Sequence, residues 1–155
     1  MALLASCCHS VKFWEPDPAT RSLQLSVASS PLPEGVTINT CLWNHSGRVL
    51  ATGRSDGSIE LIHESAQWMN GLGLNTPKDA VLSMSFNSRS RLLAVGNAGA
   101  NVHVWDLKTR NLHRGFAGHR GPVTATAFAP RDTHMASGGG EDGAILLHDL
   151  RAKDE

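Results

Sequence analysis

The sequence predicts an all-β protein built from repeated antiparallel sheets of four strands, and two observations lead to this prediction. Four segments share one plan, an apolar pair, a small residue, a turn and then an alternating run, and helical periodicity is sustained nowhere. The four segments end at Trp14, His63, Trp105 and His148, which are 49, 42 and 43 residues apart. A repeat of about 40 to 45 residues is typical of four-stranded propeller blades. We therefore expect a row of blades.

Each of the four segments is expected to form a β-hairpin. They cover residues 3–15, 49–64, 92–106 and 134–149. Apolar residues such as Val102 and Val104 alternate with polar neighbours, which is the period of a strand with one buried face. Glycines and Asp-Gly pairs between the two runs supply the tight turns.

An alternating run precedes each of the three later hairpins and is predicted to be the inner strand of its blade. These runs cover residues 36–43, 80–87 and 122–129. Small and β-branched residues suit this position, because neighbouring blades cover both faces of an inner strand. More polar runs are predicted to be outer strands, at 21–26, 67–72 and 110–116. The resulting blade units are 1–28, 29–75, 76–117 and 118–155.

Composition argues against several classes of function. The chain carries 14 basic and 14 acidic residues, so no strong field favours binding to nucleic acid or to an anionic membrane. Three unevenly spaced cysteines favour a reducing compartment. The amino terminus lacks the pattern of a signal peptide, and no segment approaches the roughly 20 apolar residues that span a bilayer. We expect a soluble protein of the cytoplasm or nucleus.

Residues 107–150 resemble a repeat of the WD40 family. His119 stands ahead of the predicted inner strand, Asp142 lies in the hairpin turn, and Trp105-Asp106 ends the preceding blade. In that family a His, a Ser or Thr, an Asp and a Trp form a buried hydrogen-bonded chain within one blade. The resemblance implies a WD40 β-propeller.

The same resemblance implies that His119, Ser137 and Asp142 belong to such a chain, with His148 at the position of the tryptophan. Two residues that end the preceding blade are assigned to the same structural network, namely Trp105 and Asp106. A connected set of buried polar groups would set the register between a hairpin and the loop before it. Neutral imidazole can donate one N–H, as indole does, so His148 is interpreted as a structural replacement. A catalytic His148 is the alternative, against which stands the lack of a nucleophile or base spaced around it.

The two preceding units depart further from the family pattern. The unit that ends at His63 keeps Thr52 and Asp56 but has Leu32 where the family has histidine. The unit that ends at Trp105 has lost the other members of the chain. The resemblance therefore depends on the recurrence of four similar segments at regular spacing.

The order of motifs also resembles the neural-precursor-cell-expressed, developmentally down-regulated family of WD-repeat proteins. The hairpin at 3–15, the run NVHVWDLKTRNLHRGFAGHRGPVT and the His that follows ILL carry this resemblance over essentially all 155 residues. In that family the propeller helps to place the protein at centrosomes and spindle microtubules, and a helical region engages γ-tubulin complexes. The resemblance implies a non-catalytic scaffold of the cytoskeleton, with γ-tubulin complexes or centrosomal proteins as partners.

Two other classes of function are alternatives. The first is another WD40 adaptor, such as a substrate receptor of a ubiquitin ligase or a subunit of a chromatin complex. The second is an enzyme, but neither a Gly-x-Ser-x-Gly elbow nor a carboxylate pair is present, and no Gly-rich run precedes a helix. Cys7-Cys8-His9 lacks the spacing of zinc ligands. No catalytic residue, cofactor or metal is expected.

In WD40 propellers the loops before the inner strands and the hairpin turns share one rim. The polar residues of these loops, which we expect to contact a partner, are Arg54, Lys78, Asp79, Asn97, Asn101 and Arg120. Exposed loop residues on a rigid scaffold often carry binding functions. The basic cluster at Arg89 and Arg91 falls in another turn and is interpreted as solvated.

The strands add up to a partial propeller, with about three and a half blades of the roughly seven common in the family. An open arc of blades exposes apolar flanks and unpaired strand edges. We therefore expect that the remaining propeller blades or self-association of the chain cover the two ends.

Overall fold

The computed structural model describes residues 4–7, 10–28, 32–63, 68–69 and 78–151, and all regular elements in these ranges are strands. Every strand pairs antiparallel with its neighbour in the chain, within four separate sheets. The predicted all-β class and the partial propeller are confirmed. No helix in the described ranges is long and apolar enough to cross a membrane.

The four sheets contain three, four, four and three strands in chain order, as the sequence predicts. The first sheet consists of β1 (Leu4–Cys7), β2 (Val11–Asp17) and β3 (Ser22–Ala28). The second consists of β4 (Ile38–Trp43), β5 (Val49–Arg54), β6 (Ile59–His63) and β7 (Trp68–Met69). The third consists of β8 (Val81–Phe86), β9 (Leu92–Asn97), β10 (Val102–Asp106) and β11 (Asn111–Phe116). The fourth consists of β12 (Val123–Phe128), β13 (His134–Gly139) and β14 (Ile145–Asp149).

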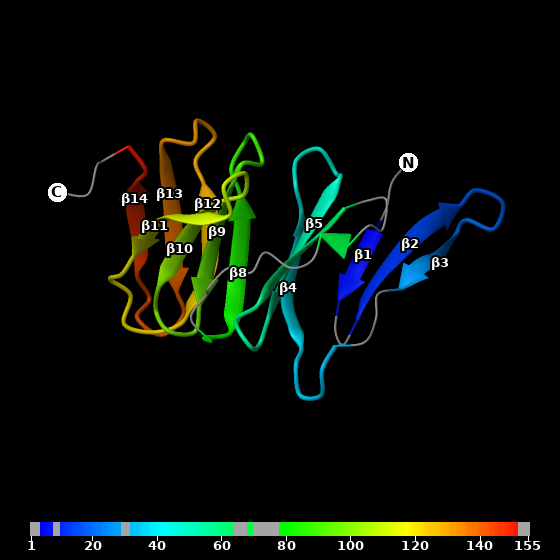
Figure 1. Ribbon diagram of the computed structural model, residues 1–155, viewed down its shortest axis with the longest axis horizontal. Coiled ribbons are helices and arrows are strands. Elements are labelled where there is room, and N and C mark those ends of the chain that lie inside the picture. Colours follow the sequence, from blue (N-terminus) through cyan, green and yellow to red (C-terminus); the bar gives the residue numbers. More distant parts are fainter. Residues whose placement is uncertain (1–3, 8–9, 29–31, 64–67, 70–77, 152–155) are drawn as a thin grey trace.

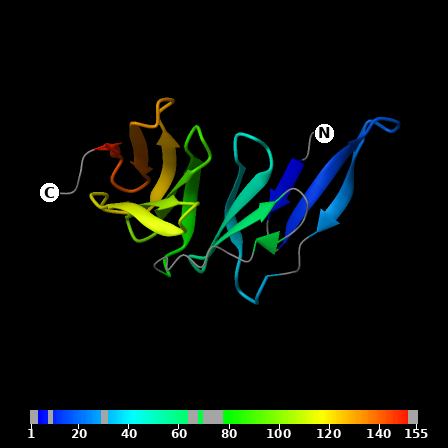
Figure 2. The same cartoon turned by 45° about the horizontal axis from the view of Figure 1, so that its top comes forward.

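The sheets stand side by side, with the first and the last at opposite ends of the molecule (Figures 1 and 2). The inner strands β4, β8 and β12 lie within two residues of the predicted bounds at each end. Strand β8 packs against both β4 and β12, so the inner strands connect the last three sheets. The loops that follow β4, β8 and β12 lie at one edge of the molecule, which is the upper edge in Figure 1.

A repeated close approach joins neighbouring sheets. A Cβ atom on Gly96 of β9 would lie 2.7 Å from Val123 Cγ1, so only glycine leaves room for the inner strand of the next sheet. Gly53 of β5 faces Val81 in the same way. Gly138 holds the corresponding place on β13, where an added Cβ would meet only Ala125 of its own sheet, at 3.5 Å. The third copy of this contact is therefore open.

Apolar side chains fill the spaces between the sheets, because each sheet buries both of its faces only by stacking. One cluster joins the first and second sheets and consists of Val11, Phe13, Ile38, Leu50 and Ile62. Another joins the third and fourth sheets and consists of Ala94, Val102, Val104, Val123 and Met135. The far side of the fourth sheet differs, since Ile145 and Leu147 of β14 are 80% and 72% exposed.

Candidate functional site

Four polar side chains of the fourth sheet form one hydrogen-bonded chain. His119, ahead of β12, lies with Nδ1 2.9 Å from Asp142 Oδ2 in the β13–β14 turn. His119 Nε2 lies 2.8 Å from Ser137 Oγ on β13, and Ser137 Oγ lies 2.7 Å from His148 Nε2 on β14. Ser137 is 2% exposed, and both histidines are 9% exposed. The structure thus brings together all four residues that the sequence resemblance grouped in this unit.

Asp142 anchors one end of the chain as an ionised carboxylate. The backbone N–H groups of Ala144 and Arg120 donate to it over 3.0 Å each, and His119 lies beside it. These groups, with Ala144 contributing most, lower the pKa of Asp142 to about 2. Asp142 is therefore a hydrogen-bond acceptor at neutral pH.

The charge of Asp142 orients every proton along the chain. An ionised carboxylate only accepts, so the neutral form of His119 places its Nδ1–H toward Asp142 and accepts the Ser137 hydroxyl proton at Nε2. The Ser137 oxygen then accepts the Nε2–H of His148, as it would accept an indole N–H. Burial is the main cause that lowers the pKa of His148, and it favours this neutral form.

The connectivity of Asp142, His119 and Ser137 resembles that of a Ser-His-Asp triad. The fold also brings the Ser137 hydroxyl, 11 residues away in the chain, to 2.7 Å from His148 Nε2. The expectation that no nucleophile is spaced around His148 is therefore wrong. Ser137 is nevertheless buried, and its oxygen already accepts the His148 proton. The arrangement fits a structural polar core between a loop and its hairpin.

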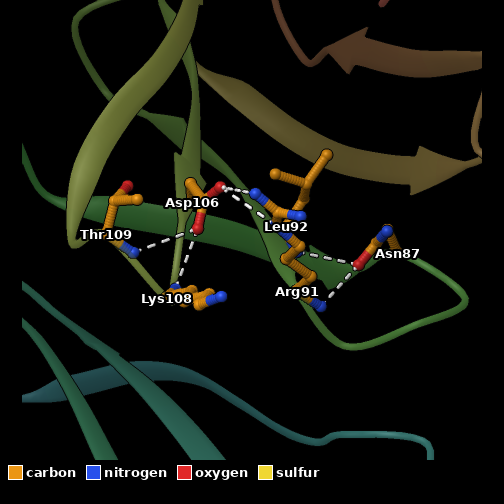
Figure 3. A network of polar contacts seen from close by, with 6 residues as sticks. All are labelled: Asn87, Arg91, Leu92, Asp106, Lys108 and Thr109. Carbon is orange, nitrogen blue, oxygen red and sulfur yellow. Dashed lines mark hydrogen bonds and ion pairs between the residues drawn. The ribbon is translucent and has the colours of Figure 1, made fainter.

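Trp105 and Asp106, which the sequence analysis grouped with this chain, lie in the third sheet and form separate contacts. Trp105 is 5% exposed, and its Nε1 has no hydrogen-bond partner among the described residues. Asp106 accepts hydrogen bonds from Arg91 Nη2 at 2.8 Å and from the backbone N–H groups of Lys108 and Thr109 (Figure 3). The loss of the polar partners in this unit thus leaves the indole unpaired.

The predicted partner rim is only partly available to a partner. Asn97 was expected to be an exposed contact, and this expectation is wrong, because the residue is 3% exposed. Its Oδ1 accepts the backbone N–H of Asn101 at 3.0 Å, and this bond closes the β9–β10 turn. Arg54 is ion-paired with Glu60, and its side chain is 19% exposed. The amide of Asn97 and the guanidinium of Arg54 are therefore used within their own hairpins.

Other members of the rim remain accessible. Lys78 and Arg120 are exposed, and Asp79 and Asn101 are partly exposed. These residues come from the loops before β8 and β12 and from the β9–β10 turn. They remain candidates for contacts with a partner.

An unpredicted clamp joins the third and fourth sheets on the opposite edge. Asp132, in the β12–β13 loop, accepts hydrogen bonds from Ser88 N at 2.8 Å, from Ser88 Oγ at 2.5 Å and from Asn87 Nδ2 at 3.0 Å. Asp132 has φ of 56°, a left-handed conformation that the equivalent turn of the second sheet meets with Gly47. An aspartate in place of that glycine was the only sequence signal for this clamp.

The described residues contain no group of three His, Cys, Asp or Glu side chains that could hold a metal ion. The Cys7-Cys8-His9 alternative cannot be placed, because Cys8 and His9 lie outside the described residues.

Stacked four-stranded sheets joined at inner strands define a propeller-type protein, and comparison with known families agrees. The family described as WD domain, G-beta repeat, matches residues 26–63, 73–106 and 110–149. The chain belongs to this WD40 family. The last match runs from β11 of the third sheet through β14 of the fourth, so a sequence repeat spans two sheets and links them covalently.

Several curated proteins are similar to the chain. COMPASS component SWD3 of Saccharomyces cerevisiae is 28% identical over 69% of this chain and 33% of its own length. Protein NEDD1 of Homo sapiens is 26% identical over 94% of this chain and 21% of its own length. WD and tetratricopeptide repeats protein 1 of Mus musculus is 31% identical over 74% of this chain and 17% of its own length. The chain thus spans a third or less of the length of these relatives.

Proposed function

We propose that the protein is a non-catalytic scaffold that helps to place γ-tubulin complexes at the centrosome and spindle for microtubule nucleation. The observation that carries this proposal is the similarity to Protein NEDD1, which extends over 94% of the chain, whereas the similarity to SWD3 covers 69%. Similarity over nearly the whole chain agrees with the order of motifs, which resembles this family from the hairpin at 3–15 onward. A buried polar core without an accessible nucleophile supports a scaffold rather than an enzyme.

WD40 domains mediate contacts between proteins, and the rim offers charged groups for such contacts. Lys78 and Arg120 are exposed on loops that rigid strands hold in place, so little conformational entropy is lost when a partner binds. We place the contacts with γ-tubulin complexes or centrosomal proteins on this rim.

The second candidate is an adaptor of another multiprotein complex. The similarity to a COMPASS component favours it, because that similarity extends over 108 residues at 28% identity. The two candidates differ in the location of the protein and in the proteins bound.

The test uses the tagged full-length protein in dividing cells. We expect a signal at spindle poles and recovery of γ-tubulin with the protein. The variant Lys78→Glu/Arg120→Glu is expected to reduce recovery at least fivefold, whereas the control variant Lys12→Glu/Lys108→Glu reverses two exposed charges elsewhere and is expected to retain it.

A diffuse or nuclear signal without γ-tubulin would reject the first candidate and favour the second. Normal location with equal losses for both variants would reject the rim as the contact surface. Thermal unfolding of each purified variant verifies that the charge reversals leave the fold intact.

A further inference from the structure

A groove of about 740 Å³ lies between the third and fourth sheets, at the edge that carries the Asp132 clamp. Its walls include the β8–β9 loop with Arg89 and Arg91, the β12–β13 loop with Arg131, and His113 of β11. The loops that follow the inner strands form this edge, so the groove lies away from the predicted partner rim (Figure 1).

The acidic side chains of the groove already have partners. Asp106 accepts hydrogen bonds from Arg91 Nε at 3.1 Å and from Arg91 Nη2 at 2.8 Å, and two backbone N–H groups complete its shell. Asp132 is held by the side chains and backbone of the β8–β9 loop. These contacts help to keep the pKa of both carboxyls below the ordinary value, so both are ionised.

The arginines of the groove are less fully paired. Three arginines stand against two aspartates, which leaves an excess of positive charge. Arg89 lies close enough to Asp132 to lower its pKa, but within the described part of the chain neither Arg89 nor Arg131 has a hydrogen bond or a salt bridge. Two exposed guanidinium groups are therefore available to a ligand.

The loops that present these arginines are held rigidly. Asn87 Oδ1 accepts the backbone N–H groups of Arg91 and Leu92, each at 2.8 Å (Figure 3). The Asp132 clamp then ties this loop to the loop that carries Arg131. Because these bonds fix the backbones of both loops, less backbone entropy is lost on binding than when two arginines lie on independent flexible loops.

We propose that this groove binds a glutamate- or aspartate-rich segment of a partner protein, with carboxylates seated on Arg89 and Arg131. The Arg91–Asp106 pair shows that the groove already forms the same contact internally. The planar guanidinium fork matches a carboxylate and gives charge-assisted hydrogen bonds. The function proposed above is not needed for this inference.

Single-stranded nucleic acid fits the groove less well. Such binding relies on aromatic side chains that stack on bases, and the groove lining contains no Phe, Tyr or Trp.

The test measures fluorescence anisotropy of a labelled peptide of alternating Glu and Gly residues with the purified full-length protein, at low ionic strength. We expect saturable binding that weakens as salt is added, and no binding of the matching peptide with Gln in place of Glu. Arg89→Ala/Arg131→Ala is expected to weaken binding at least tenfold. Arg21→Ala/Arg48→Ala removes two exposed arginines that belong to neither the groove nor the rim and is expected to change binding less than twofold.

Arg89→Lys/Arg131→Lys keeps both charges without the fork and is expected to give an intermediate loss. The absence of saturable binding to the Glu peptide would overturn the proposal, as would equal losses in both alanine variants. Tighter binding of a single-stranded RNA of equal length would overturn it in favour of a nucleic-acid groove. Circular dichroism of each variant verifies the fold, and the rim variant Lys78→Glu/Arg120→Glu separates this site from the proposed γ-tubulin contacts.

Discussion

The clamp between Asp132 and the β8–β9 loop gives a quantitative test of how neighbouring sheets are held together. Asp132→Ala removes three hydrogen bonds. It also leaves Asn87 Nδ2 without its partner, although Asn87 is only 4% exposed. Hydrogen bonds to charged groups contribute about 1.5 to 3 kcal/mol when buried, and we take about 1 kcal/mol each because Ser88 is exposed. The expected loss of unfolding free energy is about 3 kcal/mol.

Two further substitutions at Asp132 separate the clamp from the backbone conformation. The left-handed φ of 56° costs a residue other than glycine about 1 kcal/mol, so Asp132→Gly recovers that amount and is expected to lose about 2 kcal/mol. Asp132→Asn keeps an acceptor oxygen and tolerates the conformation, so it is expected to lose about 1 kcal/mol. The expected order of stability is Asp, Asn, Gly and then Ala.

The assay is thermal unfolding of the full-length protein at one fixed concentration, followed by tryptophan fluorescence. For a chain of this size, about 1 kcal/mol corresponds to about 2 to 4 °C in Tm, so the Asp132→Ala variant is expected to melt about 6 to 12 °C below the parent. A glycine variant as stable as the parent would refute the reasoning, because strain relief would then fully offset the loss of the clamp.

Three further perturbations test other parts of the fold. Because the pKa of His148 is lowered in the folded protein, the unfolded chain binds more protons than the folded chain near and below pH 6.5. The free energy of unfolding is therefore highest above this pH and decreases as the pH falls. His148→Trp is expected to flatten this dependence in unfolding measurements at pH 7.5 and 5.5, and unchanged steepness would exclude His148 as its source. The added methyl of Gly96→Ala overlaps the next sheet, so this variant is expected to lose about 2 kcal/mol or more of unfolding free energy. The methyl of Gly138→Ala meets open space beside one other methyl, so this variant should lose less than about 1 kcal/mol. Equal losses in urea unfolding would contradict the stacking contact. Ile145→Lys/Leu147→Lys is expected to reduce concentration-dependent association in light scattering, because these side chains are 80% and 72% exposed, and unchanged association would place the contact elsewhere.

Local patterns in the sequence were sufficient for the strands. Alternation with a period of two and regularly spaced turns are properties of neighbouring residues, so the inner strands were placed within two residues of their bounds. Family resemblance added the grouping of His119, Ser137 and Asp142, which local spacing could not supply. The exposure of Ile145 agrees with the strand count, because the described part of the fourth sheet has three strands.

Whether a polar loop residue is buried and hydrogen-bonded or exposed to solvent depends on the tertiary arrangement of the sheets. Asn97 and Arg120 are both polar residues near turns, yet the amide of Asn97 is buried in its own hairpin while Arg120 faces solvent. Asp132 reaches Ser88 across 44 residues of chain because β8 and β12 lie in adjacent sheets. Contacts of this kind join segments distant in sequence, and no periodicity within either segment reports them. The same stacking places Arg89 and Arg131 on two walls of one groove, where neither forms a hydrogen bond or a salt bridge within the described chain.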